Sequence, residues 1–297
     1  MNAQGFISLT VITSSDGEEW DDMGRIGRGW KLAKMSLSII RKDKEILIFP
    51  ILSGMVTIII LASFFVGVIF SVGFDELASG SSSWYFYAFL AAFYFVSFFV
   101  SIFFNACVIG CATIRMNGGD PTVKDGFRIA MENIGRIAAW ALFAATIGLI
   151  IRTIQERVGF IGKMIMGALG VAWTVVTYFV VPVLIYEKLG PWGSVKRSAS
   201  ILRKTWGEAL VGNLGLGLIF FLLGALGFIP IILGALVGGV VGAIAGFVIA
   251  IVYWLIIAVI ASAAQSVLVA ALYRYATTGK ESEDFEAFVF AQPWASR

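Results

Sequence analysis

The fold is decided by residues 209–273, which contain no charged side chain. Their sequence is ALVGNLGLGLIFFLLGALGFIPIILGALVGGVVGAIAGFVIAIVYWLIIAVIASAAQSVLVAALY. A helix that crosses a membrane needs about 20 consecutive apolar residues, so this run is long enough for two crossings. Pro230 interrupts it. The run therefore predicts either two membrane helices with a buried connection or three helices.

Four further apolar runs come earlier, at residues 46–72, 84–114, 134–151 and 164–186. The whole chain is 59% hydrophobic and 14% charged, with a mean hydropathy of +0.90. Soluble domains have about 45–50% apolar and about 25% charged residues. This contrast excludes an ordinary soluble globule, a disordered chain and a nucleic-acid-binding protein. We expect an all-α membrane protein with about six transmembrane helices.

Lysine and arginine residues gather before the first run, after the second and after the fourth. Because cytoplasmic connections carry an excess of these residues, we expect these three segments in the cytoplasm. Six spans place both termini there too, whereas seven would place the carboxyl terminus outside. We favour six spans in the cell membrane.

Each of the three basic segments has the pattern of an amphipathic helix that runs into an apolar span. The transmembrane domain, residues 24–279, is therefore divided into three helical hairpins at about 24–118, 119–190 and 191–279. In the first two basic segments, GWKLA at 29–33 matches GFRIA at 126–130, and the third agrees only in pattern. A polar arm at 1–23 and an acidic, aromatic tail at 280–297 flank this domain.

Two motifs, WKLAKMS at 30–36 and KDKEILIFP at 42–50, resemble the opening of a group of prokaryotic integral membrane proteins of unknown function. Gly190-Pro191, followed by a basic helix and Trp206-Gly207, is similar too. The resemblance covers most of residues 24–279. It implies six spans and cytoplasmic ends, and it supplies no activity and no catalytic residue.

Gly234, Gly238, Gly242 and Gly246 recur every four residues, which on one helix makes a smooth ridge. Such ridges allow close approach of helix backbones in lipid. The ridge has three interpretations: close packing within the chain, a contact between subunits of a homo-oligomer, or a bent or re-entrant segment.

The basic residues Lys31, Lys34, Arg41 and Lys42 share one side of the first amphipathic helix. They set topology and anchor the helix at the interface, or they bind anionic lipid headgroups specifically. The lipid bilayer is accordingly the expected partner.

Polar residues inside the apolar runs include Asn105, Asn213, Ser262 and Gln265. Such side chains hold helices together or line a polar path. The chain has no histidine and no catalytic motif, so we expect no enzyme activity, no cofactor and no metal. Two function classes remain: an oligomeric channel or passive permeation protein, or a lipid-associated scaffold or accessory protein without transport activity.

Overall fold

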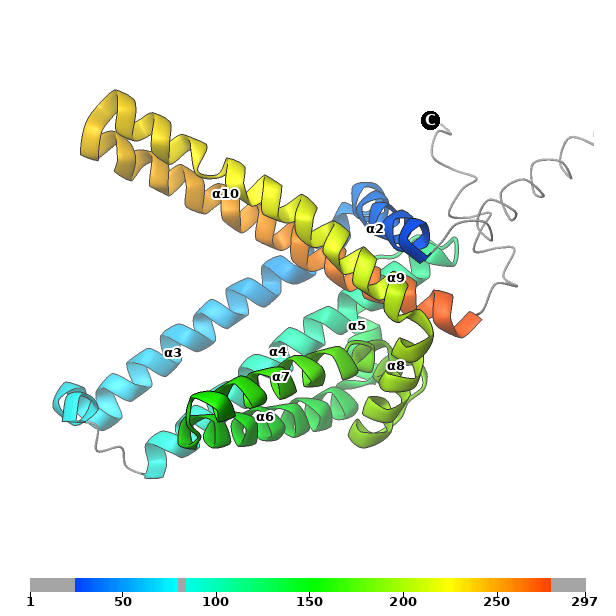
Figure 1. The fold of residues 1–297 in the computed structure, drawn as a ribbon, viewed down its shortest axis with the longest axis horizontal. Helices are drawn as coiled ribbons and strands as arrows, with labels where there is room; N and C mark the ends of the chain where they lie inside the picture. The colour runs from blue at the N-terminus through cyan, green and yellow to red at the C-terminus, as the bar shows by residue number, and fades with distance from the viewer. Residues whose placement is uncertain (1–24, 80–83, 279–297) are drawn as a thin grey trace, which may run out of the picture. The chain divides into compact units, whose positions relative to one another are not determined.

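The computed structural model describes residues 25–79 and 84–278, which form helices joined by short connections (Figure 1). The predicted arm at 1–23 and tail at 280–297 lie outside the described residues. The described part contains no strand, so the all-α prediction is confirmed. Its helices are α2 (Arg25–Lys42), η1 (Lys44–Leu47), α3 (Ile48–Ser79), α4 (Trp84–Met116), α5 (Val123–Glu132), α6 (Ile134–Arg157), α7 (Phe160–Val176), α8 (Val180–Tyr186), α9 (Pro191–Leu226) and α10 (Ile229–Thr278).

Five helical stretches of the described chain are long and apolar enough to cross a membrane: Lys44–Val68, Ala88–Met116, Ile134–Arg157, Ile161–Tyr186 and Pro191–Thr278. The first four overlap the four runs predicted before residue 209. The fifth has 88 residues, far more than the roughly 20 that one crossing requires.

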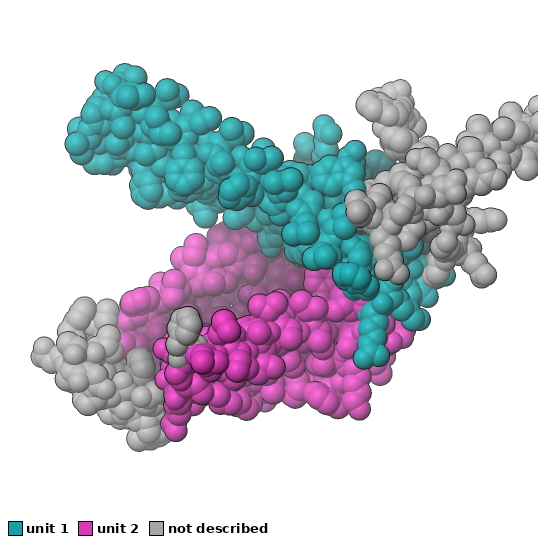
Figure 2. Space-filling view, in the orientation of Figure 1, with its two compact units in different colours: residues 1–47, 111–122, 203–297 teal, residues 48–110, 123–202 magenta. Residues whose placement is uncertain are grey.

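The helices belong to two compact units, coloured separately in Figure 2. Among the described residues, unit 1 contains 25–47, 111–122 and 203–278. Unit 2 contains 48–79, 84–110 and 123–202. Unit 1 is therefore built from three separate parts of the sequence.

The last apolar run folds back on itself as a helical hairpin within unit 1. Gly239 makes the reversal, with φ +57° and ψ −137°, a conformation that is strained for any residue with a Cβ. The first arm contains residues 203–238 and the second arm residues 240–278. Pro230 does not cause the reversal, because it lies at the start of α10, where a missing N–H costs no helical hydrogen bond.

Contacts between positions at nearly equal distances along the chain from Gly239 show that the two arms are antiparallel. The hydroxyl of Tyr253 donates to the carbonyl oxygen of Leu223 at 2.7 Å, and Nε1 of Trp254 donates to that of Gly224 at 2.9 Å. Figure 1 shows the arms side by side, in yellow and orange. Both aromatic side chains thus satisfy their polar groups inside the hairpin.

Three of the four periodic glycines pack between these arms. A Cβ on Gly234 would overlap the carbonyl oxygen of Gly242, one on Gly242 would overlap that of Gly234, and one on Gly246 would overlap that of Pro230. Gly238 lies beside the reversal, where an added Cβ would meet no described atom within 4 Å. The predicted continuous ridge on one helix is therefore wrong, because the helix is interrupted between Gly238 and Gly242. The contact with another subunit remains a hypothesis.

Helix α2 packs on the base of this hairpin. Ala33, Ile39 and Ile40 are at most 5% exposed, and an added Cβ on Gly215 of the first arm would come within 2.8 Å of Cε3 of Trp30. Apart from Ala250, the buried side chains of the second arm likewise gather at its base, in residues 263–273. The protein core of unit 1 is therefore at the hairpin base, whereas the distal hairpin exposes apolar side chains.

Unit 2 is held together by aromatic contacts. Phe127 of α5 meets Phe49 of α3 and Phe103 of α4, with ring centroids 5.6 and 6.1 Å apart. Trp140 of α6 stacks on Trp173 of α7 at 6.1 Å. These rings connect helices that the sequence predicts separately.

Each basic helix is followed by a break at a buried polar residue. Asp43 separates α2 from η1, Asn133 separates α5 from α6 with φ −111° and ψ 10°, and Thr205 breaks α9 with φ −120° and ψ 17°. The three residues are 7%, 4% and 2% exposed. An exposed lysine precedes each break at an identical spacing, namely Lys34, Lys124 and Lys196.

These breaks set a register for the repeated segments that differs from the predicted one. They align Ala33 with Val123 and Val195, so the pairing of residues 29–33 with 126–130 is wrong. A short local likeness produced that pairing, whereas the break depends on where one helix ends and the next begins. In the corrected register the third segment matches the first closely: WGSVKRSASILRK at 192–204 against WKLAKMSLSIIRK at 30–42.

Candidate functional site

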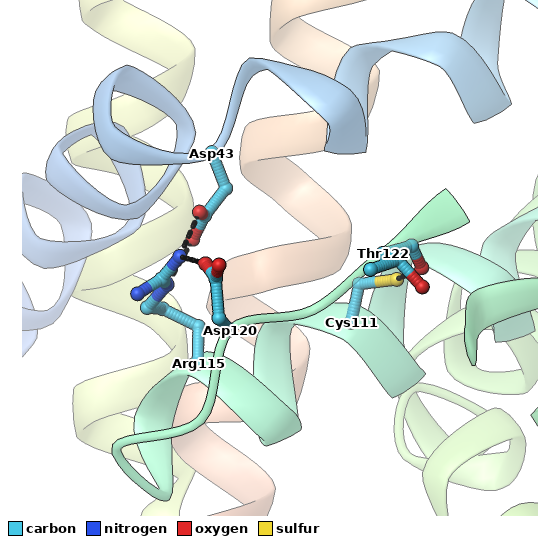
Figure 3. Close-up of polar contacts among 5 residues, drawn as sticks. All are labelled: Asp43, Cys111, Arg115, Asp120 and Thr122. Atoms are coloured by element: carbon cyan, nitrogen blue, oxygen red, sulfur yellow. Dashed lines mark hydrogen bonds and ion pairs between the residues drawn. The ribbon is translucent and has the colours of Figure 1, made fainter. Parts of the chain in front are cut away.

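Arg115, in the last turn of α4, is the centre of a polar cluster in unit 1 (Figure 3). Its guanidinium donates to both carboxylate oxygens of Asp43 and also to Asp120. The side chains of Asp43, Arg115 and Asp120 are 7%, 20% and 90% exposed. Bidentate charge-assisted pairs are strong when shielded from water, so the Asp43–Arg115 pair dominates and Asp120 contributes little.

Two further hydrogen bonds hold residues 117–122, which follow α4 in unit 1. The thiol of Cys111 donates to the carbonyl oxygen of Thr122 at 3.5 Å (Figure 3), and Arg274 of the second arm donates to Asn117. The turn contains Gly118 with φ +80°, which favours glycine. The cluster thus connects the break after α2 with the ends of α4 and α10.

The charged side chains of Asp43, Arg115 and Asp120 bind one another, so this cluster suits a structural role better than the binding of an external ion. These three residues are called the clasp below. In the part of the chain that the structure describes, no three histidine, cysteine, aspartate or glutamate side chains gather as metal ligands. Both cysteines, Cys107 and Cys111, are buried and are not joined in a disulfide.

A second polar pair joins the hairpin arms closer to the reversal. The amide of Gln265 donates to Oδ1 of Asn213, and Nδ2 of Asn213 donates to the carbonyl oxygen of Ala209 at 2.7 Å. Two of the four residues proposed for a polar path are therefore brought together. Their side chains bind each other and hold the arms in register, as polar groups between membrane helices commonly do.

The other two residues proposed for the path are not part of this pair. Ser262 is exposed, and its carbonyl oxygen accepts a bond from the hydroxyl of Ser266 at 3.0 Å. Asn105 belongs to unit 2, where its Oδ1 is buried and has no hydrogen-bond partner among the described residues.

The sequence interpretation missed two buried acidic residues. Glu208 is 3% exposed at the base of the first arm, one residue before the charge-free run 209–273 begins. Asp43 lies within the stretch RKDKE at 41–45, where the sequence predicts a functional role only for the basic residues Arg41 and Lys42. An acidic residue among bases, just before an apolar span, was the available signal for an ion pair.

Three of the four predicted headgroup residues of α2 are exposed. Lys34, Arg41 and Lys42 are exposed, and the side chain of Lys31 lies outside the described part. Two bases near the end of the third basic segment, Arg203 and Lys204 of α9, are likewise exposed.

Helices of this length and apolarity define the chain as an all-α, multi-helix membrane protein. The chain belongs to the family of unknown function DUF6159, whose family model matches residues 84–283. The predicted membership of an uncharacterised family is thus confirmed, although the match begins after the motifs at 30–50 that suggested it. No curated protein and no solved structure matches the chain.

Proposed function

We propose that the chain is a non-enzymatic, lipid-associated protein of the cell membrane whose basic interfacial helices bind anionic headgroups. The supporting observation is the division of α2 between two environments. Its apolar residues Ala33, Ile39 and Ile40 are buried, while Lys34 and Arg41 are exposed. The charged side therefore remains available to headgroups, where each base contributes roughly 1 kcal/mol.

An oligomeric channel ranks second. A water-filled path through an oligomer would need polar side chains on the surfaces that subunits share. The distal hairpin instead presents Leu236, Val237, Val240 and Val241, each 77–89% exposed. The side-chain amide of Gln265 donates a hydrogen bond to that of Asn213, so these two polar groups bind each other. Ion flux through the purified, reconstituted protein would favour the channel over the scaffold.

The full-length protein should retain anionic lipid preferentially. Purified from mixed micelles of phosphatidylglycerol and phosphatidylcholine, it should carry several-fold more phosphatidylglycerol by native mass spectrometry. Higher salt should reduce this enrichment, because the Debye length falls from about 10 Å at 0.1 M to about 3 Å at 1 M. Arg41→Gln combined with Lys42→Gln should lower the affinity about thirtyfold, because two bases that each contribute roughly 1 kcal/mol are lost.

Arg157→Gln combined with Lys163→Gln is the matched control, because it removes the same charge near the connection between α6 and α7. This change should have a smaller effect, since these bases do not belong to an interfacial helix. Equal retention of the two lipids by the wild-type protein would overturn the proposal.

We also propose six crossings with both termini in the cytoplasm. The two-armed hairpin supports an even number when added to the four preceding stretches. With the natural cysteines replaced, a cysteine at Ser81 should react with an impermeant thiol reagent in intact cells. Cysteines at Asp120 and Gly190 should react only after permeabilisation. External labelling at Gly190 would contradict this topology, and external labelling at Ser282 would indicate a seventh span.

A further inference from the structure

The corrected repeat register places a tryptophan and a lysine at the same positions in two interfacial helices. Trp30 and Lys34 begin the matching segment of α2, and Trp192 and Lys196 begin that of α9. The first pair belongs to unit 1 and the second to unit 2. The same local arrangement is therefore present once in each unit.

The two pairs also have the same geometry. Nζ of Lys34 lies 5.6 Å from the ring centroid of Trp30, and Nζ of Lys196 lies 5.8 Å from that of Trp192. Both distances are within the roughly 6 Å range of a cation–π interaction. Each ammonium is thus held beside an indole ring by residues one helical turn apart.

Each indole is also fixed on one side by its own unit. Trp30 lies against Gly215, and Trp192 meets Phe143 with ring centroids 6.4 Å apart at an interplanar angle of 67°. The two tryptophans nevertheless remain 38% and 58% exposed, and both lysines are exposed. Their open sides therefore form a preorganised surface with a cation and an indole.

We propose that each tryptophan–lysine pair binds the phosphate of an anionic phospholipid. The ammonium attracts the phosphate, and the indole occupies the level of the headgroup and glycerol, where tryptophan is enriched at membrane interfaces. This inference rests on the proposed function, and it identifies the residues that hold individual lipids.

The third basic helix provides an internal comparison. Lys124 of α5 occupies the same register position, but the position of the tryptophan is taken by Asp120, which binds Arg115. Lys124 therefore offers a positive charge at the interface without an indole in the corresponding place.

The test compares charge-neutral tryptophan variants with charge-removing lysine variants in the full chain. Trp30→Leu and Trp192→Leu keep the net charge, so a purely electrostatic surface would bind phosphatidylglycerol as before. We expect affinity about two- to fivefold lower at each site, because the cation–π contribution is lost. Trp206→Leu removes another exposed tryptophan, which pairs with no lysine in the described residues, and should leave affinity unchanged.

Lys34→Gln and Lys196→Gln should each weaken binding more than Lys124→Gln, although all three remove one charge. Affinity is measured by titrating phosphatidylglycerol and counting bound lipids by native mass spectrometry. Each variant must retain the unfolding midpoint of the wild type in neutral lipid. If Trp30→Leu fails this condition through its contact with Gly215, Trp192→Leu and the lysine series decide the question.

The outcomes separate this inference from the function on which it rests. Wild-type protein without preference for anionic lipid would overturn both. A wild type that prefers phosphatidylglycerol, with tryptophan variants unchanged and equal effects at the three lysines, would overturn only the paired sites. Displacement of the lipid by millimolar inorganic phosphate would identify a site for free phosphate and would also overturn the inference.

Discussion

Gly242→Ala should destabilise the protein by about 2–3 kcal/mol, although glycine-to-alanine changes normally favour a helix by about 1 kcal/mol. The added methyl group would overlap the carbonyl oxygen of Gly234. A backbone atom cannot rotate away as a side chain can, so the two arms must separate near the reversal. The measurement is the free energy of unfolding of the purified protein, titrated with a denaturing detergent.

Gly217→Ala is the matched control, because an added Cβ at this position of the first arm would meet no described atom within 4 Å. It should leave the free energy of unfolding unchanged or raise it slightly, whereas Gly242→Ala should lower it. Light scattering distinguishes the hairpin from the subunit-contact hypothesis. A folded species of lower mass from Gly242→Ala would support the latter and contradict packing within the chain.

The sequence alone predicted the helices because hydropathy is a local property. The runs at 84–114 and 134–151 begin at the same residues as α4 and α6. The ends were less predictable, since α6 continues to Arg157 through polar residues that extend a helix without interrupting its hydrogen bonds. The fourth run proved to be two helices, α7 and α8, with a break that its uniform apolarity concealed.

The reversal at Gly239 was not predictable from the glycine spacing. Glycines at every fourth position fit a continuous ridge and also fit two arms that face each other, because both need close backbone approach. Pro230 was the more conspicuous interruption, but proline is compatible with the first turn of a helix. The doublet Gly238-Gly239 was the local signal that distinguished the two arrangements.

The clasp at the hairpin base was beyond sequence reasoning for a different reason. Asp43 and Arg115 are separated by most of the first repeated segment, and a single sequence contains no information about which charges meet. The exposed bases of α2, in contrast, were identifiable because charge and amphipathic periodicity are read within one helix.

Asp43→Asn should be the most destabilising conservative substitution in the clasp. We expect it to lower the free energy of unfolding by about 3 kcal/mol. The substitution keeps the size of the side chain but removes the charge that binds Arg115 in a bidentate pair. Arg115 is only 20% exposed, so water cannot fully replace the lost carboxylate. Unfolding free energy in detergent, with helical content by circular dichroism, measures the effect.

Asp120→Asn is the matched control because it removes an acidic partner of the same guanidinium that is 90% exposed. Its cost should stay within about 1 kcal/mol, as for other exposed ion pairs, and should diminish further in high salt. Arg115→Gln closes a double-mutant cycle with Asp43→Asn, in which the combined loss should be clearly smaller than the sum of the single losses. Equal losses for Asp43→Asn and Asp120→Asn, or strict additivity in the cycle, would show that the pair does not hold the break after α2 against the end of α4.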